Sequence, residues 1–251
     1  LQIILLKFAD DSKLARVVSS EDDRKKLQDA LEKLCEWARK WGMSFNVKKC
    51  KVMHIGHANK RADYTMEGQI LEETTEEKDI GVHVTGDLKP STHCAKAANM
   101  AMSVLRQLQK NFTYRDRATF VKLYVQYVRP HLEFASPAWS PWQEGDKSVL
   151  EKVQEKALKM VSGIKANSYE ERCEKLGLET LEKRRRIQDM VETYRILCSR
   201  NDGYAGGLLE TVRDTGARTR QAADPLNLVH KYARTEAVSY THLTLPTILR
   251  V

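Results

Sequence analysis

The pattern of apolar residues changes near residue 89, and this change constrains the fold of the 251-residue chain more than any other feature. Before it, short β-favouring runs alternate with turn residues. After it, apolar residues recur at the helical period over long stretches such as AKAANMAMSVLRQL and RATFVKLYVQYV. Sheets and helix bundles bury their apolar faces differently, so we predict an α+β chain with two domains that join near residues 86 to 94.

The first half reads as a sheet with one helix. LQIILLKF and KLARVV flank ADDS, which predicts a hairpin with Asp10 and Asp11 at its tip. A helix is predicted from the N-cap Ser20 to the stop Gly42, with apolar positions, its tryptophans included, packed in the core. The predicted core positions of that helix are Leu27, Leu31, Leu34, Trp37, Ala38 and Trp41. Later strands are expected in CKVMHIG, in a YTMEGQIL hairpin and in DIGVHV.

The second half reads as helices joined by a PHLEFASPAWSPW connector. We expect one helix to stop before Pro130, and two more near residues 149–162 and 181–199. Periodicity is lost from Asn201 onward. VSYTHLTLPT, at 238–247, resembles a translated sequencing-library adapter and is excluded from fold reasoning. The expected divisions are therefore 1–88, 89–200, a loose tail at 201–237 and the adapter-like segment 238–251.

Charge and cysteine content narrow the class of partner. The net charge of +8 favours phosphate-bearing partners, although basic residues also solvate ordinary helices. The five cysteines are widely spaced without a C-x-x-C pair, and the histidines form no ligand-spaced cluster, which argues for a reducing compartment and against zinc. The apolar start, Ile3 to Leu6, is too short to span a membrane, so no membrane partner is expected.

Asp10 and Asp11 are the residues with the clearest chemical potential. A solvated turn explains an acidic pair of this kind, because Asp is common in turns. The alternative is a magnesium site, since Mg²⁺ takes oxygen ligands and keeps several waters or phosphate oxygens. Two-metal phosphoryl transfer needs carboxylates from more than one strand, and this pair supplies the share of one strand only.

An ordered series of segments resembles the non-LTR (LINE-type) retrotransposon reverse transcriptases. Phe8-Ala9-Asp10-Asp11 resembles their aromatic-x-Asp-Asp box. WARKWGM with FNVKKCKVMHIG is similar to their next palm motif, and KDIGVHV to their primer-grip strand pair. LYVQYVRPHLEFASPAWSP and LEKVQEKALKMVSG resemble the thumb segment and the helix after it. The resemblance covers roughly residues 1 to 200 and implies a partial polymerase palm followed by a helical thumb.

The resemblance implies a role for each matched residue near the box. Asp10 would be a catalytic metal ligand and Asp11 its neighbour, which tunes the charge. Phe8 would pack beneath the primer end, and Ala9 would let the backbone approach it. Lys49 resembles the basic residue near the departing pyrophosphate. A pair of solvated strand lysines, Lys48 and Lys49, is the alternative.

Further along the chain, two interpretations stay open for each candidate. Ile80, Gly81 and Val82 would belong to the primer grip or to an ordinary buried strand. Arg129, with Trp139 and Trp142, would line the template-primer channel, whereas the core of the thumb is the other place for these aromatics. The run Lys183 to Arg186 is a solvated helix face or, less commonly, a phosphate contact.

The family implies an RNA-directed DNA polymerase that uses Mg²⁺ and acts on an RNA template, a DNA primer and deoxynucleotides, inside the cell, in nucleus and cytoplasm. Its other metal-binding Asp lies on a strand upstream of the hairpin, so we expect this chain to be inactive alone. We also expect Ile3 to Leu6 to be exposed and the chain to self-associate. The alternatives are a non-catalytic, basic, helical nucleic-acid-binding module and a purely structural helical protein.

Overall fold

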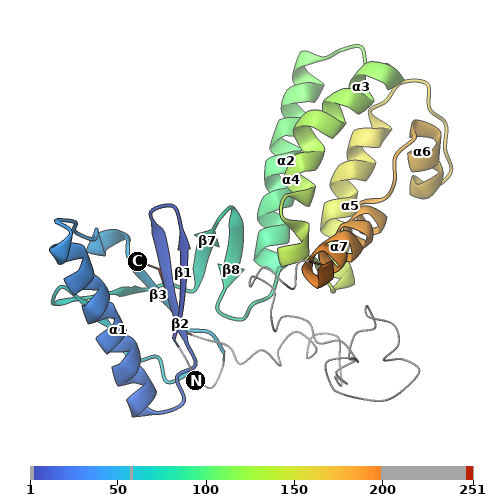
Figure 1. The fold of residues 1–251 in the computed structure, drawn as a ribbon. Helices are drawn as coiled ribbons and strands as arrows, with labels where there is room; N and C mark the ends of the chain where they lie inside the picture. Colours follow the sequence, from blue (N-terminus) through green and yellow to red (C-terminus); the bar gives the residue numbers. More distant parts are fainter. Residues whose placement is uncertain (1–2, 57–58, 199–246, 251) are drawn as a thin grey trace, which may run out of the picture. The chain divides into compact units, whose positions relative to one another are not determined.

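The chain has a mixed α+β fold in two compact units, drawn in Figure 1. The computed structural model describes residues 3–56, 59–198 and 247–250. The described residues up to Thr92, together with 247–250, form unit 1, which carries the strands. Unit 2 begins at His93 and is helical throughout its described part. Within the described residues, no helix is long and apolar enough to cross a membrane.

Unit 1 is built on a five-stranded sheet with the order β1-β2-β9-β3-β6. β1 and β2 form the predicted hairpin, with Phe8 opposite Asp11. β9 is antiparallel to both β2 and β3, and β6 is parallel to β3. The strands of this sheet are β1 (Ile4–Phe8), β2 (Asp11–Arg16), β3 (Lys51–Met53), β6 (Glu72–Glu73) and β9 (Thr247–Arg250). β9 therefore comes from the segment that resembles an adapter.

Helix α1 (Glu21–Lys40) packs on this sheet as its apolar period predicts. Ser20 is the N-cap, and its hydroxyl accepts a hydrogen bond from the backbone of Asp23. The buried face of α1 joins one cluster with residues of β2, β3 and β4, whose members are Leu14, Leu27, Leu31, Cys35, Cys50, Val52, Tyr64, Met66 and Leu71. The prediction that both tryptophans of the helix are core residues is wrong: Trp37 is 45% exposed and Trp41 66%.

Two short hairpins complete unit 1. β4 (Thr65–Met66) and β5 (Gln69–Ile70) turn at Glu67 and Gly68, as predicted. DIGVHV does not form the single strand expected, because Ile80 and Gly81 turn the chain between β7 (Glu76–Asp79) and β8 (Val82–Thr85).

Unit 2 packs its helices around a core that includes Leu105, Phe120, Tyr124, Leu132 and Leu150. Its elements are α2 (Ser91–Asn111), α3 (Arg117–Leu123), the π-helical turn η2 (Tyr124–Val128), α4 (Arg129–Glu133), the 3₁₀ turn η3 (Ser136–Ala138), α5 (Glu144–Lys159), α6 (Tyr169–Leu176) and α7 (Leu181–Cys198).

Pro130 does not end the helical path, contrary to the prediction. It lies in the first turn of α4, a position that tolerates proline. The backbone reaches it through the π-helical turn η2, and its carbonyl accepts a hydrogen bond from the Phe134 amide at 3.0 Å. The connector is therefore partly helical. The predicted tail 201–237 lies outside the described residues.

Candidate metal and nucleic-acid site

The acidic pair lies at the tip of the β1–β2 hairpin. Ala9 and Asp10 form the two-residue loop, and Asp11 is the first residue of β2. Ala9 has a φ of 52°, a left-handed value that is costly for a residue with a Cβ. Phe8 is 60% exposed, Asp10 is exposed and Asp11 is half-buried. The hairpin thus presents an aromatic ring and two carboxylate side chains at one end of unit 1.

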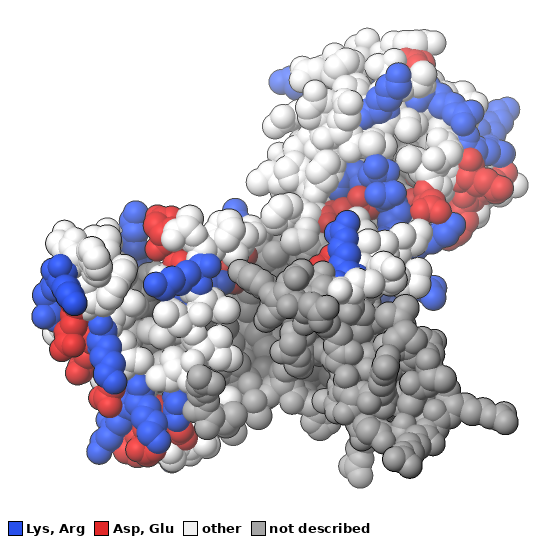
Figure 2. Space-filling view, in the orientation of Figure 1, with Lys and Arg blue, Asp and Glu red and all other residues white. Residues whose placement is uncertain are grey.

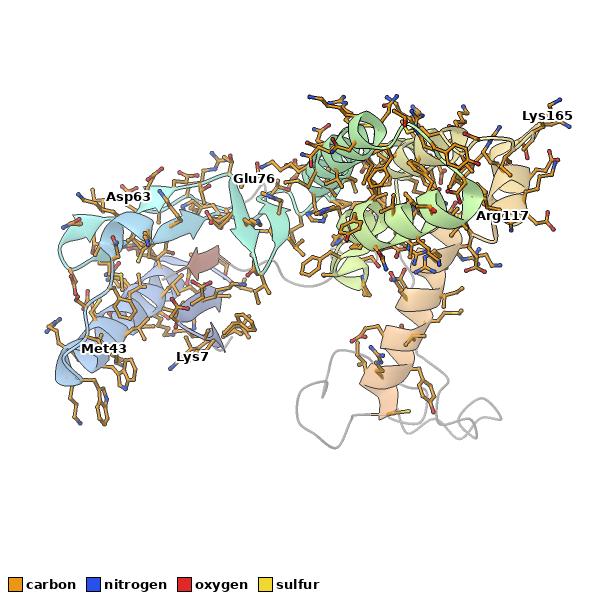
Figure 3. The ribbon with its side chains drawn as sticks, turned by 90° about the horizontal axis from the view of Figure 1, so that it is seen from above. Lys7, Met43, Asp63, Glu76, Arg117 and Lys165 are labelled. Atoms are coloured by element: carbon orange, nitrogen blue, oxygen red, sulfur yellow. The ribbon has the colours of Figure 1, made fainter. Side chains whose placement is uncertain are left out.

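The hairpin carries a lysine on each of its two faces. Because side chains alternate along a strand, Lys7 and Leu14 share the face toward α1, whereas Asp11 and Lys13 share the other face. The Lys7 ammonium lies 5.0 Å from the centre of the Trp37 ring, and Figure 3 shows Lys7 at the rim of unit 1. Lys13 forms an ion pair with Asp79, at the end of β7. This pair ties the hairpin to its neighbour.

The neighbouring hairpin carries Ile80 and Gly81 at its turn. Their φ values of 43° and 88° are those of a type I′ turn, which matches the right-handed twist of the strands. Figure 1 shows this turn and the Asp10 turn at the same end of unit 1. Ile80 and Gly81 are exposed and Val82 is half-buried, so the alternative of an ordinary buried strand is wrong for the turn residues.

The base of that second hairpin is fixed by a close backbone contact at Gly86. Its amide donates to the Thr75 carbonyl at 3.0 Å, and its carbonyl accepts from the Gly56 amide at 3.2 Å. A Cβ at Gly86 would lie 2.9 Å from the His54 carbonyl oxygen, which is too close without a shift of the backbone. Glycine is therefore required here by packing.

Lys49 lies at the same end of the sheet as the acidic pair. Through β9, Lys51 is in register with Lys13, because both pair with Arg250. β2 and β3 are consequently parallel to each other. The residues just before β3 therefore lie at the same end of the sheet as Asp11. The 3₁₀ turn η1 (Val47–Lys49) holds Lys49, exposed, in that position. Two strand spacings, about 10 Å, separate β2 from β3. Lys48 and Lys49 lie in this turn, not in the strand that the sequence predicted.

The donor set fits one part of a magnesium site. Asp10 and Asp11 offer carboxylate oxygens, which are the ligands that Mg²⁺ prefers. Among the residues that the structure describes, no group of three or more His, Cys, Asp and Glu side chains is placed to hold a metal. The hairpin on its own therefore supplies two carboxylates and needs further ligands from elsewhere.

The candidate nucleic-acid-binding residues in unit 2 mainly make contacts within that unit. Arg129 is half-buried, with Nε 3.5 Å from Glu133 Oε2, and the same carboxylate accepts a hydrogen bond from Arg184 Nη2 at 3.1 Å. Trp139 is buried; its Nε1 donates to the Phe134 carbonyl at 2.8 Å, and its ring lies 4.5 Å from that of His93. The core interpretation therefore holds for Trp139.

The run Lys183 to Arg186 does not form one solvated face, contrary to the prediction. Arg185 is only 2% exposed, and its Nη2 lies 3.7 Å from Glu151 Oε1. Lys183 is exposed, 2.7 Å from Glu179. On the face seen in Figure 2, basic and acidic side chains alternate along α1, in agreement with the Arg24–Glu21 and Lys26–Asp22 ion pairs. Several of the basic side chains of α1 and α7 are therefore paired locally with carboxylates.

Sequence reasoning missed two contacts that position the β7–β8 hairpin: the Lys13–Asp79 ion pair with the β1–β2 hairpin, and the close approach of Gly86 to the His54 carbonyl after β3. Both join residues far apart in the chain. The dipeptide Ile80-Gly81 gave a partial signal, since Gly at the second turn position is usual in two-residue hairpins.

Comparison with known proteins agrees with part of this interpretation. No family model matches the chain, and no solved structure matches it significantly. Over 170 residues, 64% of this chain, it is 25% identical to the RNA-directed DNA polymerase from the mobile element jockey of Drosophila funebris. The match spans 18% of that protein's length. The chain is thus distantly related in sequence to a mobile-element RNA-directed DNA polymerase.

Proposed function

We propose that this chain is a fragment of the RNA-directed DNA polymerase of a LINE-type retrotransposon, with residues 1–88 as part of the palm and 89–200 as the thumb. One observation carries the proposal: the Asp10–Asp11 pair forms the exposed tip of a sheet hairpin on which the following helix packs. The distant similarity to the jockey enzyme supports it. The intact parent would act inside the cell, in cytoplasm and nucleus.

The residues at this end of the sheet would each have a separate role in nucleotide transfer. Asp10 and Asp11 would hold Mg²⁺, which, when bound, stabilises charge on the reacting phosphate oxygens. Lys49, on the far side of β9, would neutralise negative charge on the departing pyrophosphate. Phe8, exposed beside the turn, offers a flat apolar surface for the primer end, and Ala9 keeps the backbone accessible. Ile80, Gly81 and Val82 lie on the hairpin that Asp79 fixes alongside, and would hold the primer strand.

The register of β9 indicates where a further metal ligand would have to come from. β9 pairs with Lys13 to Arg16 and leaves Ser12 and Asp11 beyond its last paired residue. A strand in the same place but two residues longer would reach Asp11. Its second residue after the one opposite Lys13 would lie opposite Asp11. A carboxylate at that point would lie on the same face as Asp11. Asp10 and Asp11 supply the metal-binding carboxylates of one strand only. We therefore expect no primer extension on an RNA template by this chain alone.

Manganese, a paramagnetic substitute for Mg²⁺, tests the metal site directly. We expect Mn²⁺ to broaden the amide NMR signals of residues 8–12 at lower concentration than those of residues 21–24. Residues 21–24, Glu21-Asp22-Asp23-Arg24, are the matched control, because their formal charge of −2 equals that of residues 8–12 but they lie at a helix start. The double variant Asp10→Asn, Asp11→Asn should lose the broadening at 8–12 only. Equal broadening at both segments would contradict the metal site.

Binding of an RNA–DNA hybrid tests the nucleic-acid part of the proposal. We expect fluorescence anisotropy to show binding that weakens steeply with salt. Lys49→Gln should weaken it several-fold more than Lys48→Gln, the adjacent exposed control. If binding is steep in salt but unchanged by substitutions at Asp10, Asp11 and Lys49, the alternative, a non-catalytic basic binding module, is the better description. Absence of binding at low salt would exclude both.

A further inference from the structure

The positive charge of the chain is concentrated in one part of unit 2. Residues 93–132 contain seven Lys and Arg side chains and a single carboxylate, Asp116, so they carry a formal charge of +6 out of the total of +8. The rest of the chain is therefore almost neutral. A charge distribution as uneven as this produces a local positive potential, which attracts anionic partners to that part of the surface.

Four cations of this segment lie at the surface without an acidic partner. Among the residues that the structure describes, none of the four forms an ion pair, and all are exposed: Arg106, Lys110, Arg117 and Lys122. Exposed cations elsewhere in unit 2 are neutralised, as Lys183 of α7 is by Glu179 at 2.7 Å. The four cations therefore remain available to a negatively charged ligand.

Two aromatic side chains lie exposed between these cations. The loop of residues 112–116 joins α2 to α3, and in it Phe112 is 38% exposed and Tyr114 is 77% exposed. Single exposed aromatics are ordinary features of protein surfaces. Here two of them are separated by one residue, with Lys110 before them and Arg117 after them. Rings and cations in this arrangement fit a nucleic-acid strand, because bases stack on the rings while the cations contact phosphates.

The backbone of this loop is held in place by hydrogen bonds. Arg115 Nε donates to the Phe112 carbonyl at 3.0 Å, and the Arg115 carbonyl accepts from the Ser162 amide, which follows α5, at 2.9 Å. Asp116 is engaged as the N-cap of α3, where it accepts from the Thr119 amide at 3.0 Å. The two rings are thus presented by a fixed backbone, which reduces the conformational entropy lost when a ligand binds.

We propose that this part of unit 2 binds single-stranded nucleic acid. Bases would stack on Phe112 and Tyr114, and phosphates would contact the flanking cations. We call the site the loop surface, and its members are Arg106, Lys110, Phe112, Tyr114 and Arg117. A single strand is required because the faces of the bases in a duplex are already covered. The proposal goes beyond the proposed function, whose nucleic-acid contacts lie in unit 1, and it does not depend on the polymerase assignment.

Other polyanions fit the loop surface less well. Binding to an anionic membrane relies on a continuous apolar helix face, whereas the exposed residues of α2 beside the loop are polar or charged: Arg106, Gln107, Gln109 and Lys110. An acidic polypeptide would be held by the cations and would make no use of two exposed rings. The combination of rings and unpaired cations therefore favours nucleic acid.

Fluorescence anisotropy of the full chain with a short fluorescent oligouridine RNA tests the stacking. We expect Tyr114→Ala to weaken binding about tenfold, because a base loses its stacking partner. Tyr114→Phe keeps the ring and should bind as the unaltered chain does. Tyr194→Ala is the matched control, since Tyr194 is 57% exposed on α7, and it should have no effect. The effect of Tyr114→Ala should be the same in a Lys49→Gln background, which separates this test from that of unit 1.

The salt dependence of the same binding tests the phosphate contacts. Lys110→Gln should reduce the slope of log affinity against log salt concentration by about 0.7, the value for one phosphate contact with a single strand. Lys183→Gln is the matched control, because Lys183 is exposed but already paired with Glu179. The slope should not change in this control.

Photo-crosslinking locates the bound strand. Trypsin cleaves after Lys110 and Arg115, so Phe112 and Tyr114 share the peptide 111–115. An oligouridine that carries 4-thiouridine should attach mainly to this peptide, as identified by mass spectrometry. Tyr114→Ala should reduce the attachment, and Tyr194→Ala should not.

Three results would overturn the proposal. Equal binding by Tyr114→Ala and Tyr194→Ala would show that no base stacks on the loop. A duplex of the same length that binds as tightly as the oligouridine would leave charge alone as the cause. Vesicles of anionic phospholipid that bind more tightly than the RNA would identify a membrane surface instead. If Tyr114→Ala loses helical circular dichroism, the unaltered chain decides the question, because absence of crosslinks in 111–115 would exclude the loop surface.

Discussion

Arg16 Nη2 lies 2.7 Å from Asp23 Oδ1, and this ion pair joins the last residue of β2 to the first turn of α1. Arg16 is buried, so its charge depends on this partner. The other carboxylate oxygen, Asp23 Oδ2, accepts from the Ser20 amide at 3.1 Å, which completes the capping box of the helix. One side chain therefore fixes both the start of α1 and its attachment to the sheet.

Asp23→Asn should destabilise unit 1 more than loss of the cap alone. Ser20→Ala removes the N-cap acceptor and the hydroxyl that donates to Asp23 Oδ2, and should cost about 1 kcal/mol. Asp23→Asn also leaves the buried Arg16 charge unpaired, so the loss should be larger. Urea-dependent hydrogen exchange of residues 21–40 measures both. Asp22→Asn, exposed and paired only with Lys26, is the control and should have little effect; equal losses for Asp22 and Asp23 would contradict the prediction.

The same pair predicts a pH dependence. The hydrogen bond from Arg16, followed by that from Ser20, holds the pKa of Asp23 well below its usual range. A carboxyl with a depressed folded-state pKa stabilises the fold at pH values above its unfolded pKa, about 4, and this contribution is lost as the pH falls further. The stability difference between the unaltered chain and Asp23→Asn should therefore be constant from pH 7 to 5 and shrink below pH 4. A difference as large at pH 2 as at pH 7 would refute this.

Ile80→Asn should stabilise the β7–β8 hairpin. Ile80 has a φ of 43°, which is unusual for a β-branched residue, whereas Asn-Gly is the preferred type I′ pair. The side chain is 52% exposed, so little burial is lost and a gain of about 1 kcal/mol is expected. Ile70→Asn is the control, because Ile70 is 69% exposed and is not among the residues with positive φ. Exchange of residues 76–85 measures the effect, and no gain over the control would contradict it.

Gln154 should be the most sensitive polar residue in unit 2. It is fully buried; its Oε1 accepts from the Tyr124 hydroxyl at 2.5 Å, and its Nε2 donates to the Glu179 carbonyl at 2.9 Å. Gln154→Leu keeps the side-chain volume but leaves the Tyr124 hydroxyl and the Glu179 carbonyl without this hydrogen-bond partner, at a cost of about 3 kcal/mol. Tyr124→Phe removes one donor and should cost about 1 kcal/mol. Urea-dependent exchange of residues 144–159 checks this. Exposed Gln143→Leu should be near neutral.

Thiol labelling should distinguish one cysteine from four. Cys35, Cys50, Cys94 and Cys173 are buried free thiols, and Cys198 is exposed. Burial raises the pKa of Cys94 to about 12, so its reactive thiolate is scarce at neutral pH. Under native conditions we expect one rapid label per chain, absent in Cys198→Ser, and four more after denaturation. Rapid labelling of Cys94 in the native chain would show that the core of unit 2 is open.

Local sequence signals predicted the elements whose ends are marked by cap or turn residues. Ser20 and Gly42 mark the ends of α1, and the β1–β2 hairpin with Asp10 at its loop follows from two β-favouring runs around a turn. Helix α6 carried a comparable signal that the prediction did not use: Ser168 caps it, Glu171 lies three residues on, and Gly177 ends it with a φ of 69°.

Features set by distant contacts could not be predicted from local pattern. Trp41 is in phase with the apolar stripe of α1 but lies at its C-cap, beyond the last buried residue, Ala38. Arg185 sits in a basic run, yet packing draws it into the core near Glu151. The relation of Lys49 to Asp11 depends on the register through β9, which no segment of sequence specifies alone.

The position of β9 also has a consequence for the order of folding during synthesis. A ribosome delivers the β1–β2 hairpin and α1 first, then the described helices of unit 2, and only afterwards the residues that separate β2 from β3. The helical unit can fold while the sheet still lacks the strand between β2 and β3. For that interval, nascent unit 1 is the part of the chain most in need of a chaperone.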